Sequence, residues 1–307
     1  MKSFTMSAAP HIHSGASTTK VMLDVIIALL PASIAAVVIF GIQALWIILT
    51  CVIAAVAAEA LFNACAGRKQ TVGDLSAVVT GLLLALNLST NVPLWQCVVG
   101  SVFAIIVVKC LFGGIGCNFA NPAITARVFM LITFSAVAGG ANPAGAELVS
   151  SATPLELIGT EGAQLPGMMN MFMGTYGGAI GETCSVALLV GFAYLLVRKV
   201  ISWHIPVVFI GTVFVLTFIA GGANYALYQI LAGGLFIGAI FMATDYVTSP
   251  ITKKGKVIFA VGCGLITFIV RYFCAYPEGV SFSILIMNLF VPIIERFSRN
   301  IPLGGGK

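Results

Sequence analysis

The sequence predicts an all-α polytopic membrane protein with about ten transmembrane helices, arranged as two inverted five-helix repeats in which some helices are broken or re-entrant. Three observations predict this class: the composition, the apolar runs, and the distribution of Lys and Arg. Of the 307 residues, 60% are hydrophobic and 8% are charged. A soluble domain has about 45–50% apolar and about 25% charged residues. The charges are too few to cover a water-exposed surface, which excludes a soluble enzyme and a disordered protein.

The apolar runs leave little room for anything outside the bilayer. A spanning helix needs about 20 apolar residues, so ten helices use about 200 of the 307. The polar first twenty residues lack the short apolar core and cleavage site of a signal peptide, so we expect the first run to be a retained helix. The third and fifth runs are short or carry polar residues or proline near an end, as broken helices do. The predicted spans are 21–41, 43–66, 75–91, 94–112, 119–137, 174–197, 203–221, 225–244, 257–276 and 280–297.

The basic residues set the orientation. With the N-terminus in the cytoplasm, every Lys and Arg except Arg127 and Arg271 falls on the cytoplasmic side, as the positive-inside rule requires. The net charge of +5 follows from this bias and does not indicate nucleic-acid binding. The predicted division is a cytoplasmic segment 1–20, a first repeat 21–137, an extracytoplasmic loop 138–173, a second repeat 174–298 and a cytoplasmic tail 299–307.

Two segments resemble each other weakly. Residues 80–87 end in Asn87 shortly before a proline, and residues 234–245 end in Asp245 shortly before another. The second segment lies five spans after the first, and because five is odd the second copy is inverted. Inverted repeats with broken helices place binding sites near the bilayer midplane.

A glycine-rich stretch, 113–123, precedes the fifth span. Its glycines permit tight turns, and Asn121 followed by Pro122 fits a helix N-cap and first helical residue. The stretch is either a capped helix start or a site where free backbone amides hold a polar or anionic ligand. Asn118 and Asn121 are amides near the bilayer, where polar groups need partners.

The predicted outer loop carries a second motif at residues 150–156. Thr153, Pro154 and Glu156 fit a capping box. The alternative is that the Thr153 hydroxyl is chemically modified. The small neighbours Ser150, Ser151 and Ala152 would leave it accessible, and Pro154 favours an extended backbone before it.

Ionisable residues within the spans are candidates for an ion path, or else end caps and paired structural charges. The acidic candidates are Asp24, Glu59, Glu182 and Asp245. Arg127 lies about two turns into the fifth span, and Arg271 is expected to reach outward toward Glu278.

The eight cysteines do not predict a metal site. None forms a C-x-x-C motif, and most lie in apolar runs, as small core hydrophobes do. The alternative is a thiolate-bound iron–sulfur cluster at Cys110 and Cys117, whose spacing matches no cluster signature.

Together these motifs resemble the family of the D subunit of the Rnf ion-translocating electron-transport complex, which is similar to the B subunit of the sodium-translocating NADH:quinone oxidoreductase. The resemblance covers nearly the whole chain. It rests on the stretches 10–15, 76–86, 112–123, 150–155 and 241–245.

The resemblance implies a covalent flavin. The family links FMN through its phosphate to the threonine of a Ser-Gly-Ala-Thr motif, which maps onto residues 150–153, with Thr153 as the attachment point and Ser151 in place of glycine. Asn118 and Asn121 match the asparagines at a riboflavin site in the quinone-reducing relative, which implies a second, non-covalent flavin. Arg127 is a further hypothesis, as a cation that stabilises a reduced, anionic flavin.

The resemblance also implies partners. Ferredoxin oxidation and NAD reduction would occur on the other Rnf subunits, which are designated A, B, C, E and G. A flavin transferase would attach the FMN, and Na⁺ or H⁺ would move outward across a bacterial or archaeal cytoplasmic membrane. We expect no turnover from this chain alone. Two alternatives remain: a cofactor-free transporter or channel with inverted repeats, and the equivalent subunit of the quinone-reducing complex.

Overall fold

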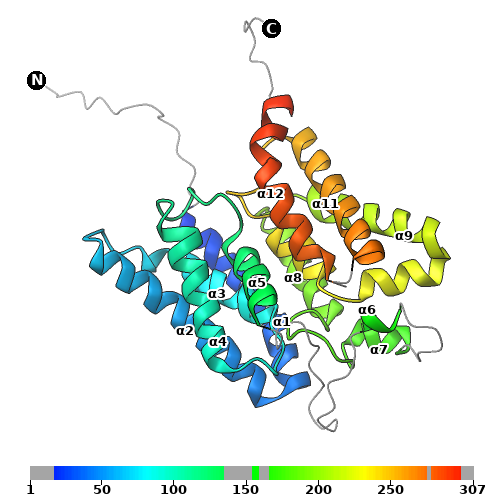
Figure 1. The fold of residues 1–307 in the computed structure, drawn as a ribbon, viewed down its shortest axis with the longest axis horizontal. Coiled ribbons are helices and arrows are strands. Elements are labelled where there is room, and N and C mark those ends of the chain that lie inside the picture. The colour runs from blue at the N-terminus through cyan, green and yellow to red at the C-terminus, as the bar shows by residue number, and fades with distance from the viewer. Residues whose placement is uncertain (1–16, 135–153, 159–165, 275–277, 299–307) are drawn as a thin grey trace, which may run out of the picture.

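The computed structural model describes residues 17–134, 154–158, 166–274 and 278–298. The described residues form helices joined by turns and irregular segments, with no β-strand (Figure 1). This confirms the predicted all-α class.

The described residues of the first half of the chain form five α-helices, with a 3₁₀ turn and a π-helix among them. Ser17 caps the first one by accepting a hydrogen bond from the Lys20 amide, and Gly41, with a φ of 76°, separates the first two. The elements are α1 (Thr18–Phe40), α2 (Ile42–Cys65), a short 3₁₀ turn η1 (Val72–Asp74), α3 (Ser76–Leu86), α4 (Leu94–Val102) continued by the π-helix η2 (Phe103–Cys110), and α5 (Pro122–Thr133).

The second half is less regular. Its longest helix, α9, bends at Gly222, whose backbone is not helical. The elements are α6 (Pro154–Leu157), α7 (Met168–Met173), α8 (Ser185–Val197), α9 (His204–Leu231), α10 (Leu235–Ile237) continued by the π-helix η4 (Gly238–Met242), α11 (Lys253–Phe273) and α12 (Gly279–Ser298).

The helix lengths confirm a polytopic membrane protein. Within the described residues, α1, α2, α9, α11 and α12 are long and apolar enough to cross a membrane, and four shorter apolar helices accompany them. The third and fifth predicted spans are short, as expected, at 11 and 12 helical residues. The bend at Gly222 lets α9 supply both the span predicted at 203–221 and the start of the next.

Two predicted spans are wrong as continuous helices. In the span predicted at 174–197, helix α8 begins only at Ser185, because residues 174–184 turn back onto the end of α3. The amides of Ile180 and Gly181 donate to the carbonyls of Leu88 and Leu86 at 2.9 and 2.7 Å. The span predicted at 225–244 breaks at 232–234, where Gly233 has a φ of 71°.

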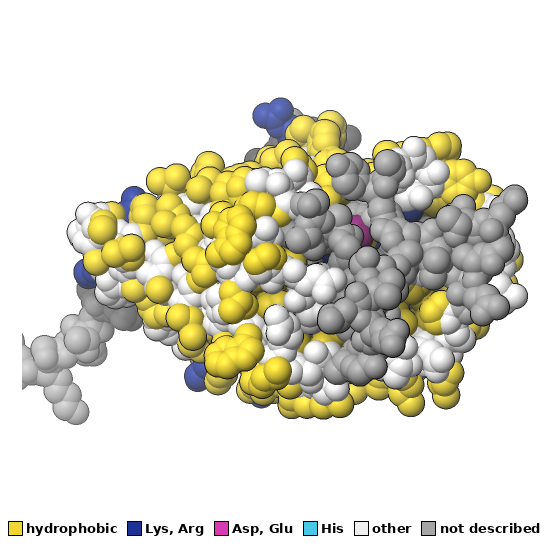
Figure 2. All heavy atoms as spheres, turned by 60° about the horizontal axis from the view of Figure 1, so that its bottom comes forward, with side chains coloured by type: hydrophobic (Ala, Val, Ile, Leu, Met, Phe, Trp, Pro, Cys, Tyr) yellow, Lys and Arg dark blue, Asp and Glu magenta, His cyan; other side chains and the backbone are white. Residues whose placement is uncertain are grey.

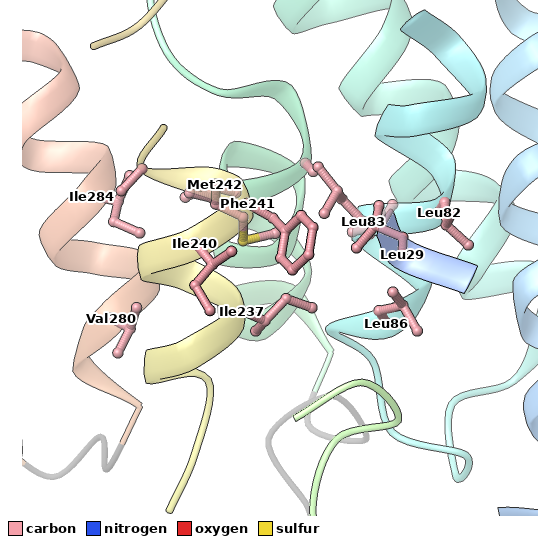
Figure 3. Close-up of a cluster of buried hydrophobic side chains, with 14 of the residues drawn as sticks. Leu29, Leu82, Leu83, Leu86, Ile237, Ile240, Phe241, Met242, Val280 and Ile284 are labelled. Carbon is pink, nitrogen blue, oxygen red and sulfur yellow. The ribbon is translucent and has the colours of Figure 1, made fainter. Parts of the chain in front are cut away.

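The two halves meet through their weakly similar segments. Figure 3 shows Phe241 of η4 pointing toward Leu83 and Leu29, while Val280 and Ile284 of α12 lie on the other side of η4. All of these side chains are buried. The Asn87 amide also lies 3.6 Å from the sulfur of Met242. This packing joins the segments that suggested a repeat, and the division into two inverted repeats stays a prediction.

The outside of the molecule is apolar. Hydrophobic side chains cover much of the face in Figure 2, with Lys and Arg at its margins. The start of α1 and the end of α12 lie at one end of the molecule, and α6 and α7 lie toward the other (Figure 1). Helices with apolar outer faces are what a lipid environment requires.

Candidate functional site

A cavity opens where the two halves of the chain meet. Its walls come from α1, α3, η2, the glycine-rich stretch, the start of α5, the end of α8, and η4. Most of the lining is apolar, and the polar groups include Asn118, Asn121, Lys109 and Asp245. We call this the central cavity. An apolar cavity with few polar groups is the usual form of a cofactor or small-molecule site.

The two asparagines of the glycine-rich stretch differ in their bonding. The Asn121 side-chain oxygen accepts from the amides of Ala123 and Ile124 at 3.0 and 3.3 Å, and its amide nitrogen donates to the Met242 carbonyl at 3.3 Å. The predicted N-cap is therefore confirmed. The side-chain oxygen of Asn118 is buried and has no hydrogen-bond donor among the described residues. Asn118 is the acceptor that a bound ligand can use.

Asp245 also lines the central cavity. Its carboxylate accepts from the Thr248 hydroxyl at 3.1 Å and from the Val247 amide at 3.5 Å. Across the described part of the chain, no Lys or Arg nitrogen lies within 4.0 Å of it. Asp245 thus keeps a carboxylate without a salt-bridge partner at the cavity wall, as an ion path needs.

Lys109 and Glu59 form a buried ion pair beside the cavity. The Lys109 ammonium donates to both carboxylate oxygens of Glu59 at 2.9 Å and to the Ser76 hydroxyl at 2.6 Å. The Lys109 residue is 2% exposed. Glu59 also accepts from Thr71 at 2.6 Å. The three N–H groups of the ammonium have acceptors, so Lys109 is a buried, paired charge, and its placement on the cytoplasmic side stays a prediction.

Arg127 sits at the centre of a second buried cluster. Its guanidinium donates to Glu182 at 2.8 Å and also to Asn87 and Glu278. These partners come from the 174–184 segment, the end of α3 and the residue before α12. Two carboxylates balance the charge of Arg127, and the side chain does not line the central cavity. Its suggested role toward a reduced flavin stays a prediction.

Arg271 does not contact Glu278, so the expected pairing is wrong. Its guanidinium instead donates to the Gln229 carbonyl at 2.5 Å, the Gln229 side chain at 3.2 Å and the Ala232 carbonyl at 3.3 Å. The last carbonyls of a helix have no partner within the helix. Arg271 therefore caps the C-terminal end of α9, where the helix stops before α10 begins. Glu278 pairs with Arg127 instead.

Asp24 is paired at the edge of the molecule. Its carboxylate accepts from the Tyr194 hydroxyl at 2.9 Å and from two nitrogens of Arg198 at 3.2 Å. The Arg198 side chain is 55% exposed. Among the ion-path candidates, Asp24 therefore matches the alternative of a structural charge that joins α1 to α8.

The predicted flavin motif, Ser150, Ser151, Ala152 and Thr153, lies outside the described residues. The chain is described again from Pro154, the first residue of α6. Leu155 is buried against Met171, Tyr176 and Ala232, and Tyr176 donates to the Leu231 carbonyl at 3.1 Å. The residue two positions after Thr153 is thus anchored beside the end of α9.

Comparison with known proteins decides the family. The sequence model of the NQR2, RnfD, RnfE family matches residues 5–304. The chain belongs to this family.

Several curated members of the NQR2, RnfD, RnfE family are similar over nearly their whole length. The D subunit of the Na⁺-translocating ferredoxin:NAD⁺ oxidoreductase complex of Acetobacterium woodii is 46% identical over 299 residues, which cover 96% of this chain and 93% of that one. The proton-translocating counterpart of Clostridium ljungdahlii is 40% identical over 318 residues, covering 98% and 96%. The D subunit of an ion-translocating oxidoreductase complex of Stutzerimonas stutzeri is 37% identical, covering 92% and 91%. The resemblance to the Rnf D subunit is confirmed.

Sequence reasoning missed the roles of three residues in these buried polar clusters: Lys109, Asn87 and Gln229. Lys109 lies inside the predicted span 94–112, and a lysine within a membrane span could have been recognised as buried. Asn87 stood out only as part of a repeat, although it bonds Arg127. Gln229 carried no sequence signal, because its role depends on the break in α9.

Proposed function

We propose that this chain is the flavin-carrying membrane subunit of an ion-translocating ferredoxin:NAD⁺ oxidoreductase complex of the Rnf type. In this proposal, FMN is linked to Thr153 and a second, non-covalent flavin occupies the central cavity. Similarity to Rnf D subunits over nearly the whole chain supports membership of the complex. The observation that carries the flavin assignment is the unpartnered, buried Asn118 oxygen at the wall of an apolar cavity.

The residues that line the central cavity fit a flavin in their chemistry. An isoalloxazine ring is flat and largely apolar, and it presents one ring N–H that needs an acceptor. Asn118 offers that acceptor, and Phe241, Leu83 and Leu195 supply apolar wall. When bound, a flavin supplies one- and two-electron transfer, and the chain binds, orients and shields it.

The attachment of FMN to Thr153 is supported by what surrounds the motif. Ser150, Ser151 and Ala152 are small, so they would leave the threonine hydroxyl accessible to a transferase. Immediately afterwards, Leu155 anchors the chain in an apolar cluster. An anchored residue so close to the tether restricts where the flavin can travel, which keeps it near α7 and the end of α9.

Buried polar groups connect these two proposed sites. Helix α5 begins at the cavity with Asn121, and Arg127 follows six residues later, a rise of about 9 Å. Arg127 binds Glu182, and a side chain added at Gly234 would collide with the Glu182 carboxylate. The neighbouring Gly233 lies between Arg271 and Leu155. The cluster therefore reaches from α5 to the segment that carries the FMN motif.

The proposed setting is a bacterial or archaeal cytoplasmic membrane, with both termini in the cytoplasm and the FMN segment outside. The A, B, C, E and G subunits would be the partners, and a flavin transferase would mature the chain. Asp24, Glu59, Glu182 and Asp245 are the proposed ion-path acids, and Asp245 is the one among them without a salt-bridge partner in the described residues. The names of the relatives support either Na⁺ or H⁺ as the ion. The family also includes NQR2, so the equivalent subunit of a quinone reductase is the second candidate.

The test asks whether the chain carries a covalently bound flavin, and whether its attachment requires the Thr153 hydroxyl. The full chain is expressed with its flavin transferase and run on a denaturing gel under ultraviolet light. We expect fluorescence from the wild type and from the control Thr160→Ala, and none from Thr153→Ala. Fluorescence in Thr153→Ala would show that the flavin is attached to another residue. A dark wild type in a transferase-competent host would favour the cofactor-free transporter.

A further inference from the structure

A second pocket lies away from the central flavin site, where the α8–α9 connection meets the start of α11. Its polar lining comes from Ser202, Thr244, Tyr246, Ser249 and Lys256. Thr252, just before α11, bonds the hydroxyl of Ser298 at the end of α12 at 2.8 Å. The pocket is therefore at the end of the molecule where α12 ends, which the proposed orientation places at the cytoplasmic surface.

The pocket contains hydrogen-bond donors that are not all paired with acceptors among the described residues. The Lys256 ammonium donates to the Ser202 hydroxyl at 3.2 Å, and no carboxylate among the described residues lies within 4.0 Å of it. Ser249 is 8% exposed, lines the pocket, and has no hydrogen-bond partner in the described part of the chain. A partly buried cation beside a hydroxyl that has no acceptor among the described residues leaves hydrogen-bond donors for an anion at this pocket.

The charge around the pocket is mostly positive, and the carboxylate of Glu295 lies beside it, where it accepts from the Ile251 amide at 3.2 Å. The first turn of α11 carries Lys253, Lys254 and Lys256 and no acidic residue, although helix starts disfavour cations because the helix dipole is positive there. Arg198 and Lys199 follow the neighbouring helix α8, and the charge of Arg198 is already balanced by Asp24. An anion seated beside Lys256 would offset this repulsion.

Exposed apolar side chains border the same pocket. Ile251 is 80% exposed, and Trp203, which precedes α9, is also exposed. Trp is enriched at the headgroup level of membranes, and basic pockets between helices at a cytoplasmic surface bind anionic headgroups. This combination of charge and exposed apolar surface favours a lipid over a free ion or an acidic protein segment.

We propose that this pocket binds the headgroup phosphate of an anionic phospholipid. Lys256 and the hydroxyls of Ser202 and Ser249 donate to the phosphate oxygens. Ile251 and Trp203 lie where the lipid leaves the pocket for the bilayer. The site requires no flavin, so it does not depend on the proposed redox function.

The test measures lipid binding to the delipidated full-length chain by native mass spectrometry in a non-ionic detergent. Dioleoylphosphatidylglycerol is compared with zwitterionic dioleoylphosphatidylcholine. We expect one tight site for the anionic lipid alone. Lys256→Gln should weaken it about fivefold, the contribution of one basic side chain near a membrane surface. The matched control is Lys254→Gln, which removes the same charge from an exposed position outside the pocket and should leave this site unchanged.

Each other outcome has a defined meaning. If Lys256→Gln and Lys254→Gln lost equal affinity for the anionic lipid, the binding would be non-specific electrostatic attraction. If the two lipids bound equally well, the pocket would be an apolar groove that does not recognise the headgroup charge. Displacement of the lipid by excess inorganic phosphate would make it a free-anion site. Carbodiimide cross-linking of Lys256 to another subunit in the intact complex would assign it to an acidic partner segment. All four would overturn the proposal. If Lys256→Gln does not fold, Ser249→Ala carries the test, and unchanged lipid affinity there would overturn it too.

Discussion

Glu182 accepts a 2.8 Å hydrogen bond from Arg127, although 55 residues separate the two in the sequence. Both side chains are 3% exposed. The contact ties the non-helical segment before α8 to α5, across the boundary between the two halves. Removing one partner of a buried ion pair leaves an uncompensated charge, whose desolvation costs much more than a surface pair contributes.

We therefore expect Arg127→Gln to be strongly destabilising. It leaves the carboxylates of Glu182 and Glu278 close together without their shared cation, so the expected loss is about 3–5 kcal/mol. The measurement is thermal unfolding of the purified chain in detergent. Arg198→Gln is the matched control, because the Arg198 side chain is 55% exposed, so water can replace much of its contact with Asp24 and the expected loss is smaller. Equal losses in the two variants would contradict a structural role for the Arg127 cluster.

The Glu59–Lys109 pair predicts a non-additive result. Lys109→Met alone strands a buried carboxylate, and we expect a loss of about 3–5 kcal/mol. The double variant Lys109→Met with Glu59→Leu removes both charges and should recover most of that loss. Unfolding of both single variants and the double variant gives the coupling energy. Simple additivity would mean that the two charges do not stabilise each other.

The sequence predicted what depends on local pattern. Apolar runs located most helices, because a spanning helix must be apolar along its whole length. The Asn121–Pro122 pair predicted the start of α5, because capping involves only neighbouring residues.

What the sequence could not show depends on contacts between distant segments. Residues 174–184 are apolar enough to be read as part of a span, but their amides bond the end of α3 instead of forming a helix. Arg127 stands out in the sequence as a cation inside a span, yet its partners lie 40, 55 and 151 residues away. Glu278 could be matched with Arg271 as easily as with Arg127, because no periodicity links either pair.

Gly81 marks a tight approach between α3 and α2. A methyl group added there would lie 2.8 Å from the Cys51 carbonyl and 2.9 Å from the Val52 Cα, both backbone atoms that cannot move aside cheaply. Gly81→Ala should destabilise the chain by about 1–3 kcal/mol through overpacking.

Gly211→Ala is the control for this prediction. It places the same methyl group in a helix interior with no heavy atom within 4 Å. The change should be neutral or stabilise the chain by up to about 1 kcal/mol, because alanine favours the helix. Thermal unfolding in detergent compares the two variants, and a harmless Gly81→Ala would show that α2 and α3 pack less tightly than described.

Substituting Asn118 should change binding of the non-covalent flavin without changing the stability of the chain. Its side-chain oxygen has no donor among the described residues, so Asn118→Ala should remove an acceptor for the non-covalent flavin and leave the unfolding temperature nearly unchanged. Asn121→Ala should instead lower stability by about 0.5–2 kcal/mol, because it removes the cap of α5.

Two measurements distinguish the flavin pools. Flavin that denaturation releases from the purified protein, quantified by chromatography, reports the non-covalent pool. Fluorescence that the denatured chain retains reports the tethered pool. We expect Asn118→Ala to reduce the first and spare the second. Loss of both would indicate that the cavity is needed for flavin attachment, and loss of neither would remove the central cavity as a flavin site while leaving Thr153 untouched.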